Sequence, residues 1–117
     1  VAHDSHQMIV IGTDESDMAL AANRLAEIGG GQVIVRRGKV IGEVPLPVAG
    51  LVSTRRADEV AAQAQTVLDA LSVCGCRMNN PNMQLSLLAL VVIPELRLSD
   101  LGLVDVNHFQ VIDVLDV

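Results

Sequence analysis

The stretch Val1–Gly12, VAHDSHQMIVIG, sets a polar cluster beside an apolar run, and we expect the fold to be organised around it. The run Met8–Ile11 is short, contains β-branched residues and is closed by Gly12. This pattern is typical of a strand that is buried on both faces. Polar residues at the mouth of such a strand commonly carry function in α/β proteins. The rest of the chain is therefore expected to cover this strand.

A helix is predicted next, from Asp14 to about Ile28. Asp14 can cap this helix, Asp17 lies three residues further on, and apolar residues recur on one face. The glycines Gly29–Gly31 are expected to end the helix, because glycine accepts the left-handed conformation found at helix ends. They precede a strand, whereas phosphate-binding glycines precede a helix, so this segment does not indicate a phosphate site.

Two strands are predicted to form a hairpin, Gln32–Arg36 and Lys39–Glu43, joined by the two-residue turn Arg37–Gly38. The segment after the hairpin, Val44–Ser53, contains two prolines, which disfavour a regular helix or a central strand. It is too apolar for a free loop, so we expect it to be irregular and packed against a neighbouring surface.

A second amphipathic helix is predicted over Arg56–Val73, with Ser53 or Thr54 as its cap and Gly75 after its end. Its apolar residues recur at helical spacing and define the face expected to be buried: Val60, Ala61, Ala64, Val67, Leu68 and Leu71. A loop over Arg77–Asn82, which contains a proline, is expected to follow.

The stretch Met83–Leu98 is predicted to hold one or two helical turns up to about Ala89, then an extended piece through Val91–Ile93; two strands are the alternative. The last elements are a turn and two short strands: Ser99–Gly102, Leu103–Val106 and Phe109–Leu115. The resulting order is β-α-β-β-α-(α)-β-β. It predicts an α/β fold, of mixed α+β type, in which two amphipathic helices cover a small mixed sheet.

The composition fits one domain, residues 1–117, since half of the residues are hydrophobic and can form a core. A net charge of −6 and a single aromatic residue argue against nucleic acid as a partner. The longest apolar run, Leu87–Ile93, is too short to cross a membrane. Cys74 and Cys76 lack a second pair for zinc, so we expect reduced thiols in a cytoplasmic protein.

Four long segments, in one order, carry a resemblance to a known family: VAHDSHQMIVIG, GTDESDMALAANRLAEIGGGQVIV, GKVIGEVPLPVAGLVS and LALVVIPELRLSDLGLVDV. They resemble the C-terminal domain of bacterial adenine deaminases, which belong to the amidohydrolase superfamily. The resemblance covers nearly all of the chain. The family usually has asparagine at the position of Gln7 and proline at the position of Val91.

The resemblance implies that the chain is a fragment of a longer enzyme, in which a metal-bearing (β/α)8 barrel hydrolyses adenine to hypoxanthine and ammonia. Manganese or iron is the implied cofactor of the full enzyme. The metal ligands belong to the barrel, so we expect no cofactor and no catalytic residue in this fragment. The implied partner is the barrel of the same chain, reached through an apolar patch at Leu46–Leu51. Stabilisation of a homo-oligomer is a second expected role.

The polar cluster supplies the candidate site residues, His3, Asp4, Ser5 and His6. One interpretation places them at the mouth of the barrel's active site, in contact with the purine or with the metal ligands. A second makes them metal ligands, although an extended chain turns His3 and His6 to opposite faces. A third has their side chains hydrogen-bond the backbone. A Ser–His–Asp triad is excluded, because adjacent residues lack the separated geometry it needs.

A stand-alone binding or assembly module is the alternative functional hypothesis, because a domain with its own core could fold alone. A barrel encoded upstream of Val1 would support the enzyme domain, and a start codon just before Val1 would support the module. A hydrolase in its own right has no complete set of catalytic residues in this sequence. His108 and Asp105 are expected to be surface, packing or turn residues.

Overall fold

The computed structural model describes residue 2 and residues 6–116 of the chain. They form two compact units, which we describe separately. The first unit comprises residues 10–81, and the second comprises residues 2, 6–9 and 82–116. Helices are combined with two antiparallel sheets, one of two strands and one of three. The α/β class is therefore confirmed, although two antiparallel sheets stand in place of the single mixed sheet.

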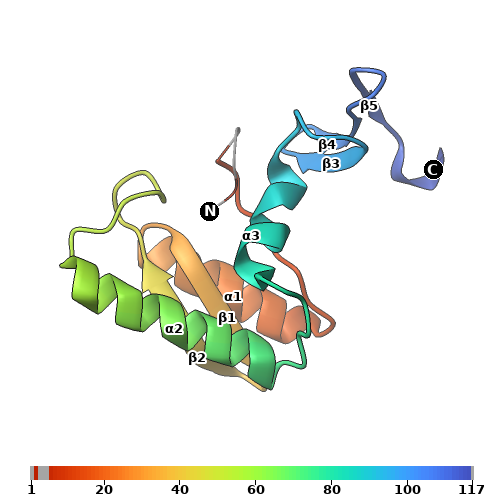
Figure 1. Ribbon diagram of the computed structural model, residues 1–117. Helices are drawn as coiled ribbons and strands as arrows, with labels where there is room; N and C mark the ends of the chain where they lie inside the picture. Colours follow the sequence, from red (N-terminus) through yellow and green to blue (C-terminus); the bar gives the residue numbers. More distant parts are fainter. Residues whose placement is uncertain (1, 3–5, 117) are drawn as a thin grey trace. The chain divides into compact units, whose positions relative to one another are not determined.

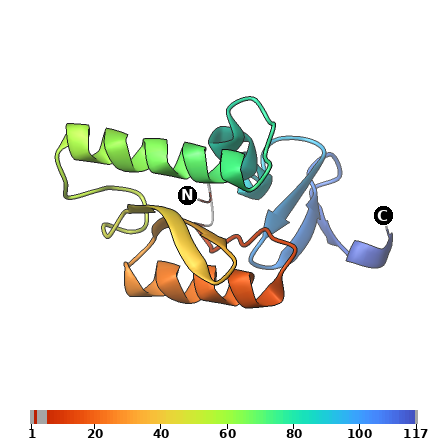
Figure 2. The ribbon, with the colours of Figure 1, turned by 90° about the horizontal axis from the view of Figure 1, so that it is seen from below.

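The first unit is a β-hairpin that lies between two helices (Figures 1 and 2). Its elements are α1 (Glu15–Glu27), β1 (Gly31–Arg36), β2 (Lys39–Pro45) and α2 (Ala57–Val73). Adjacent residues of β2 face different helices, as the pleat of a strand requires. A side chain at Gly42 would meet Thr66 and Ala70 of α2, whereas Glu43 contacts Arg24 of α1.

Helix α1 begins and ends where the sequence predicts. The Asp14 side chain accepts a hydrogen bond from the Asp17 N–H at 2.8 Å, which satisfies one of the free donors at the start of the helix. Gly29, Gly30 and Gly31 have φ angles of 80°, 110° and 129°. Only glycine adopts such angles without strain, so the three glycines turn the chain from α1 directly into β1.

The β1–β2 hairpin has the predicted two-residue turn and a brace that the sequence did not reveal. Arg37 and Gly38 both have positive φ, 52° and 73°, as the two central residues of a type I′ turn do. The Asp17 carboxylate of α1 accepts hydrogen bonds from the backbone N–H of Arg37 and of Gly38, both at 2.7 Å. One carboxylate therefore ties the tip of the hairpin to the first turn of α1.

Replacing Asp17 by alanine is expected to lower the free energy of unfolding by about 1.5 kcal/mol, because hydrogen bonds to a charged acceptor are lost. Urea-induced unfolding of the chain measures this difference. Asp69→Ala is the matched control, since Asp69 lies on the exposed side of α2 and accepts a hydrogen bond from Gln65 within its own helix at 2.9 Å. Equal losses in the two variants would contradict the proposed brace.

The core of the first unit forms where α2 meets β2 and the residue after it. Its buried apolar residues are Val44, Leu46, Val67, Ala70 and Leu71. Val67 is only 1% exposed, whereas Leu68 is 38% exposed and Ala61 is exposed as well, so the stripe predicted for α2 is right at Val67 and Leu71 and wrong at Ala61 and Leu68. The face turned to β2 includes Ala70 instead, because small side chains let α2 approach Gly42 closely.

The start of α2 also differs from the prediction. Arg56 is the residue at the cap position, and its side chain makes no capping hydrogen bond. The Ser53 hydroxyl instead accepts a hydrogen bond from the Arg55 N–H at 3.1 Å. Ser53 therefore closes a turn ahead of the helix, and the prediction that Ser53 or Thr54 caps α2 is wrong.

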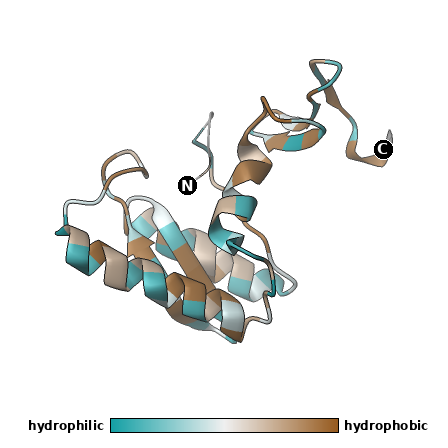
Figure 3. Ribbon diagram, in the orientation of Figure 1, coloured by the Kyte–Doolittle hydropathy of each residue, from teal (hydrophilic) through white to brown (hydrophobic). Residues whose placement is uncertain are grey.

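The second unit combines short helices with a three-stranded antiparallel sheet in the order β3-β4-β5. Its elements are α3 (Pro81–Ser86), η1 (Leu87–Ala89), β3 (Leu96–Ser99), β4 (Gly102–Asp105), β5 (Gln110–Ile112) and η2 (Val114–Asp116). Ala2, Ala89 and Val106 are buried in it. Most side chains of this unit are half-buried or exposed. Figure 3 shows hydrophobic and hydrophilic residues interspersed along it.

Three predicted extended segments are wrong or shifted. Met8–Ile11 is not a strand, because no backbone in the described residues pairs with this run. The side chains of Met8 and Ile11 are exposed. Val91–Ile93 lies in turns, and the strand starts later, at Leu96. The strand predicted over Phe109–Leu115 is reduced to Gln110–Ile112. The predicted helical turns up to Ala89 are present.

Candidate functional site

The N-terminal polar cluster is described only in part. His3, Asp4 and Ser5 lie outside the described residues, and His6 is exposed with a φ angle of 54°. The neighbouring Gln7 donates a hydrogen bond from Nε2 to the Leu98 carbonyl oxygen of β3 at 3.1 Å. Gln7 thus fixes the described end of the cluster to β3, a contact that no sequence pattern indicates.

The loop after β2 presents apolar side chains from an ordered backbone. Val48 and Val52 form an isolated bridge, in which the Val48 N–H donates to the Val52 carbonyl at 3.2 Å and the Val52 N–H donates back at 3.1 Å. Val48, Leu51 and Val52 are exposed in this loop, which we call the 48–52 loop. Leu46 is only 9% exposed, so the predicted patch at Leu46–Leu51 is shifted toward Val52.

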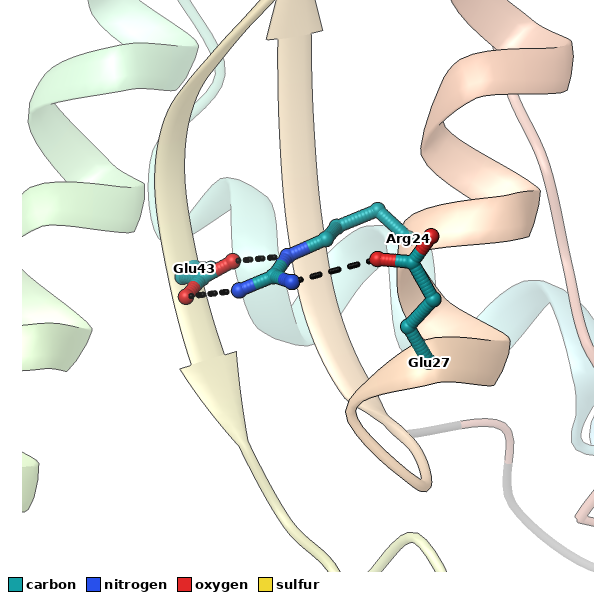
Figure 4. A network of polar contacts seen from close by, with 3 residues as sticks. All are labelled: Arg24, Glu27 and Glu43. Carbon is teal, nitrogen blue, oxygen red and sulfur yellow. Dashed lines mark hydrogen bonds and ion pairs between the residues drawn. The ribbon is translucent and has the colours of Figure 1, made fainter.

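An arginine network joins α1 to β2 (Figure 4). Arg24 donates from Nε and Nη2 to the two carboxylate oxygens of Glu43, at 2.9 and 3.0 Å, and from Nη1 to Glu27 at 3.2 Å. These hydrogen bonds, first of all those to Glu43, raise the pKa of Arg24 above its ordinary value. The guanidinium is already paired with two carboxylates, so it braces the unit and is a poor site for an anion.

Asp105 and His108 form a second polar pair, at the turn between β4 and β5. The Asp105 carboxylate accepts the His108 N–H at 3.1 Å and lies 2.7 Å from Nδ1 of the ring. The hydrogen bond with the His108 side chain is the main cause that lowers the pKa of Asp105 below its ordinary value of 3.8. Asp105 is therefore the last residue of β4 and not a turn residue, and its carboxylate closes the turn that follows and orients the His108 ring.

The lowered pKa of Asp105 predicts an acid-sensitive turn. The fold favours the ionised carboxylate, so its stabilisation is present above pH 3.8 and is lost as the pH falls through the lowered pKa. We expect the wild-type chain to exceed an Asp105→Asn variant in thermal midpoint at pH 6, with a difference that shrinks on acidification to pH about 2. A difference that stays constant over this range would contradict the assignment.

The described residues do not fit a metal site. Residue 2 and residues 6–116 contain no group of three or more histidine, cysteine, aspartate or glutamate side chains that could hold a metal ion. Cys74 is exposed, Cys76 is half-buried, and both are free thiols. None of the helices in this part of the chain has the length and apolar character needed to cross a membrane.

The described residues thus form two compact units of the α/β class, with an exposed apolar loop and an arginine network in the first and an Asp–His pair in the second. The sequence matches the family model of the adenine deaminase C-terminal domain over residues 1–110. The chain belongs to this family.

Relatives are full-length enzymes of which the chain matches one part. It is 63% identical over 116 residues to the adenine deaminase of Ruegeria pomeroyi, and 57% identical over 115 residues to adenine deaminase 3 of Rhizobium meliloti. It is 50% identical over 115 residues to the adenine deaminase of Moorella thermoacetica. The matches cover 98% or more of this chain but only 19% of each relative. No solved structure matches it.

Proposed function

We propose that this chain is the accessory C-terminal domain of a metal-dependent adenine deaminase that converts adenine and water to hypoxanthine and ammonia. In this proposal a barrel domain elsewhere in the same polypeptide holds the manganese or iron and the catalytic residues. Residues 1–117 act as one domain within a cytoplasmic enzyme of purine salvage. The observation that carries the proposal is the 63% identity to an adenine deaminase of which this chain covers 19%.

The domain's own contribution is structural in this proposal. Half of the residues are hydrophobic, yet few apolar residues among those described are buried, and the 48–52 loop exposes three apolar side chains. Burial of apolar surface against the barrel would stabilise both parts by about 25 cal/mol for each Å² removed from water. The identity to deaminases favours this role over that of a stand-alone module.

The polar cluster is the part of the domain that we propose to reach the substrate. His3, Asp4, Ser5 and His6 would lie at the mouth of the barrel's active site, where they contact the purine or the side chains that hold the metal. What supports this role is the density of hydrogen-bonding groups in four consecutive residues, together with the anchoring of the next residue, Gln7, to β3. The reaction steps themselves belong to the barrel in this proposal.

The proposed enzyme is tested with the full-length polypeptide that contains this sequence. Purified with manganese or iron, it should convert adenine to hypoxanthine and release one ammonia for each adenine consumed. Guanine serves as the control substrate, because its amino group is attached to a different ring carbon. Failure to deaminate adenine under conditions where a known adenine deaminase is active would overturn the proposal.

Replacing Val52 by aspartate tests the packing role of the 48–52 loop. Val52 is 56% exposed in this chain, so the change should leave the thermal midpoint of the isolated chain nearly unaltered. In the full-length enzyme a charge forced into an apolar contact costs several kcal/mol, and the thermal midpoint should fall by about 5 °C or more. A full-length enzyme that tolerates Val52→Asp would show that this loop faces solvent.

A further inference from the structure

The turn between β4 and β5 presents the chain's single aromatic side chain to solvent. Phe109 is 91% exposed, and its φ angle is 53°. A positive φ is costly for a bulky residue, and an exposed ring gains nothing from hydrophobic burial. Neither the backbone nor the packing of the second unit therefore favours phenylalanine at this position. Strained, exposed residues of this kind are found where a side chain serves an interaction.

The turn holds Phe109 in a fixed place. The preceding residue, His108, is tied to Asp105 through its backbone N–H and through its ring, at 3.1 and 2.7 Å. Asp105 itself belongs to β4 and pairs with Gln110, the first residue of β5. A rigid aromatic side chain loses little conformational entropy on binding, which is the property of an anchor residue that fills a pocket on a partner.

The partner is inferred from what the turn presents to it. At this end of the sheet the Asp105 carboxylate is already paired with the His108 ring at 2.7 Å, and the Glu95 carbonyl oxygen accepts the Val106 N–H at 2.9 Å. The feature that the turn offers to a partner is therefore the apolar ring of Phe109. A surface that complements this ring is an apolar pocket.

We propose that Phe109 docks into an apolar pocket on the remaining part of the same deaminase polypeptide. The relatives supply the required partner surface, because about four-fifths of each of them lies outside the match. The turn lies inside the part of the chain that defines the family, residues 1–110. This inference rests on the proposed function, and it adds a docking residue in the second unit to the 48–52 loop of the first.

Photo-crosslinking in the full-length enzyme tests the docking. Benzoylphenylalanine placed at position 109 keeps an aromatic ring there, and mass spectrometry identifies the peptide that it labels on irradiation. We expect a crosslink within one polypeptide, to a peptide that precedes Val1. The same photoreactive residue at Asn23, an exposed position of α1, is the control and should give at least tenfold less of this product.

Two outcomes would overturn the docking proposal. A crosslink between two polypeptides would mean that a second copy covers the turn, and a yield no higher than that at Asn23 would mean that Phe109 faces solvent. Adenine turnover is measured on the same sample before irradiation. Adenine turnover without the expected crosslink would contradict the docking proposal alone. Absence of turnover would contradict the deaminase assignment, so the two failures are distinguishable.

Discussion

Replacing Gly31 by alanine is expected to destabilise the first unit by about 3 kcal/mol or more, which combines backbone strain with overpacking. Gly31 has a φ angle of 129°, and an added Cβ would clash with the Val44 carbonyl oxygen and lie 2.9 Å from the Leu46 N. These are backbone atoms, so no side-chain rotation relieves the clash. The turn from α1 into β1 therefore depends on the absence of a side chain here.

Gly38→Ala is the control that separates the cost of the steric clash at Gly31 from the cost of placing an alanine at positive φ. Gly38 also has a positive φ, 73°, but an added Cβ would meet nothing within 4 Å. Gly38→Ala should therefore lower the free energy of unfolding by about 1 kcal/mol, which is the cost of holding alanine in the left-handed conformation. Urea-induced unfolding of both variants, followed by circular dichroism, measures the difference. Equal losses for Gly31→Ala and Gly38→Ala would show that the close approach of β1 to Val44 is wrong.

Replacing both His3 and His6 by alanine in the full-length enzyme is expected to lower kcat/KM for adenine, or the bound metal content, by about 10- to 100-fold. Residues that orient metal ligands or substrate typically have effects of this size. His108→Ala is the matched control, because it removes an exposed histidine that the proposal places outside the active site. Unchanged kcat/KM and metal content in the double variant would remove the proposed role of the cluster.

Local signals in the sequence predict the first unit well. The cap at Asp14, the glycines Gly29–Gly31 and the turn Arg37–Gly38 each act within a few residues, and α1, β1 and β2 follow from them. The bond from Asp17 to the hairpin joins residues about twenty apart in sequence and leaves no local pattern. Such contacts depend on the tertiary structure, so sequence patterns alone miss them.

The second unit and the N-terminal run were harder to predict. Short apolar runs such as Met8–Ile11 carry no period that separates a buried strand from an extended surface segment. The strand β3 follows Pro94, and the sequence pattern placed the extension before that proline instead. The candidate cluster His3–His6 stays a prediction, because three of its four residues lie outside the described residues.

The most direct measurement is an adenine deamination assay on the isolated 117-residue chain, with manganese or iron supplied and the full-length enzyme assayed in parallel. Circular dichroism on the same sample establishes that the chain is folded. The account predicts hypoxanthine from the full-length enzyme and none from the folded, isolated chain. Hypoxanthine produced by the isolated chain would contradict it, because the domain would then contain the catalytic residues that we assign to the barrel.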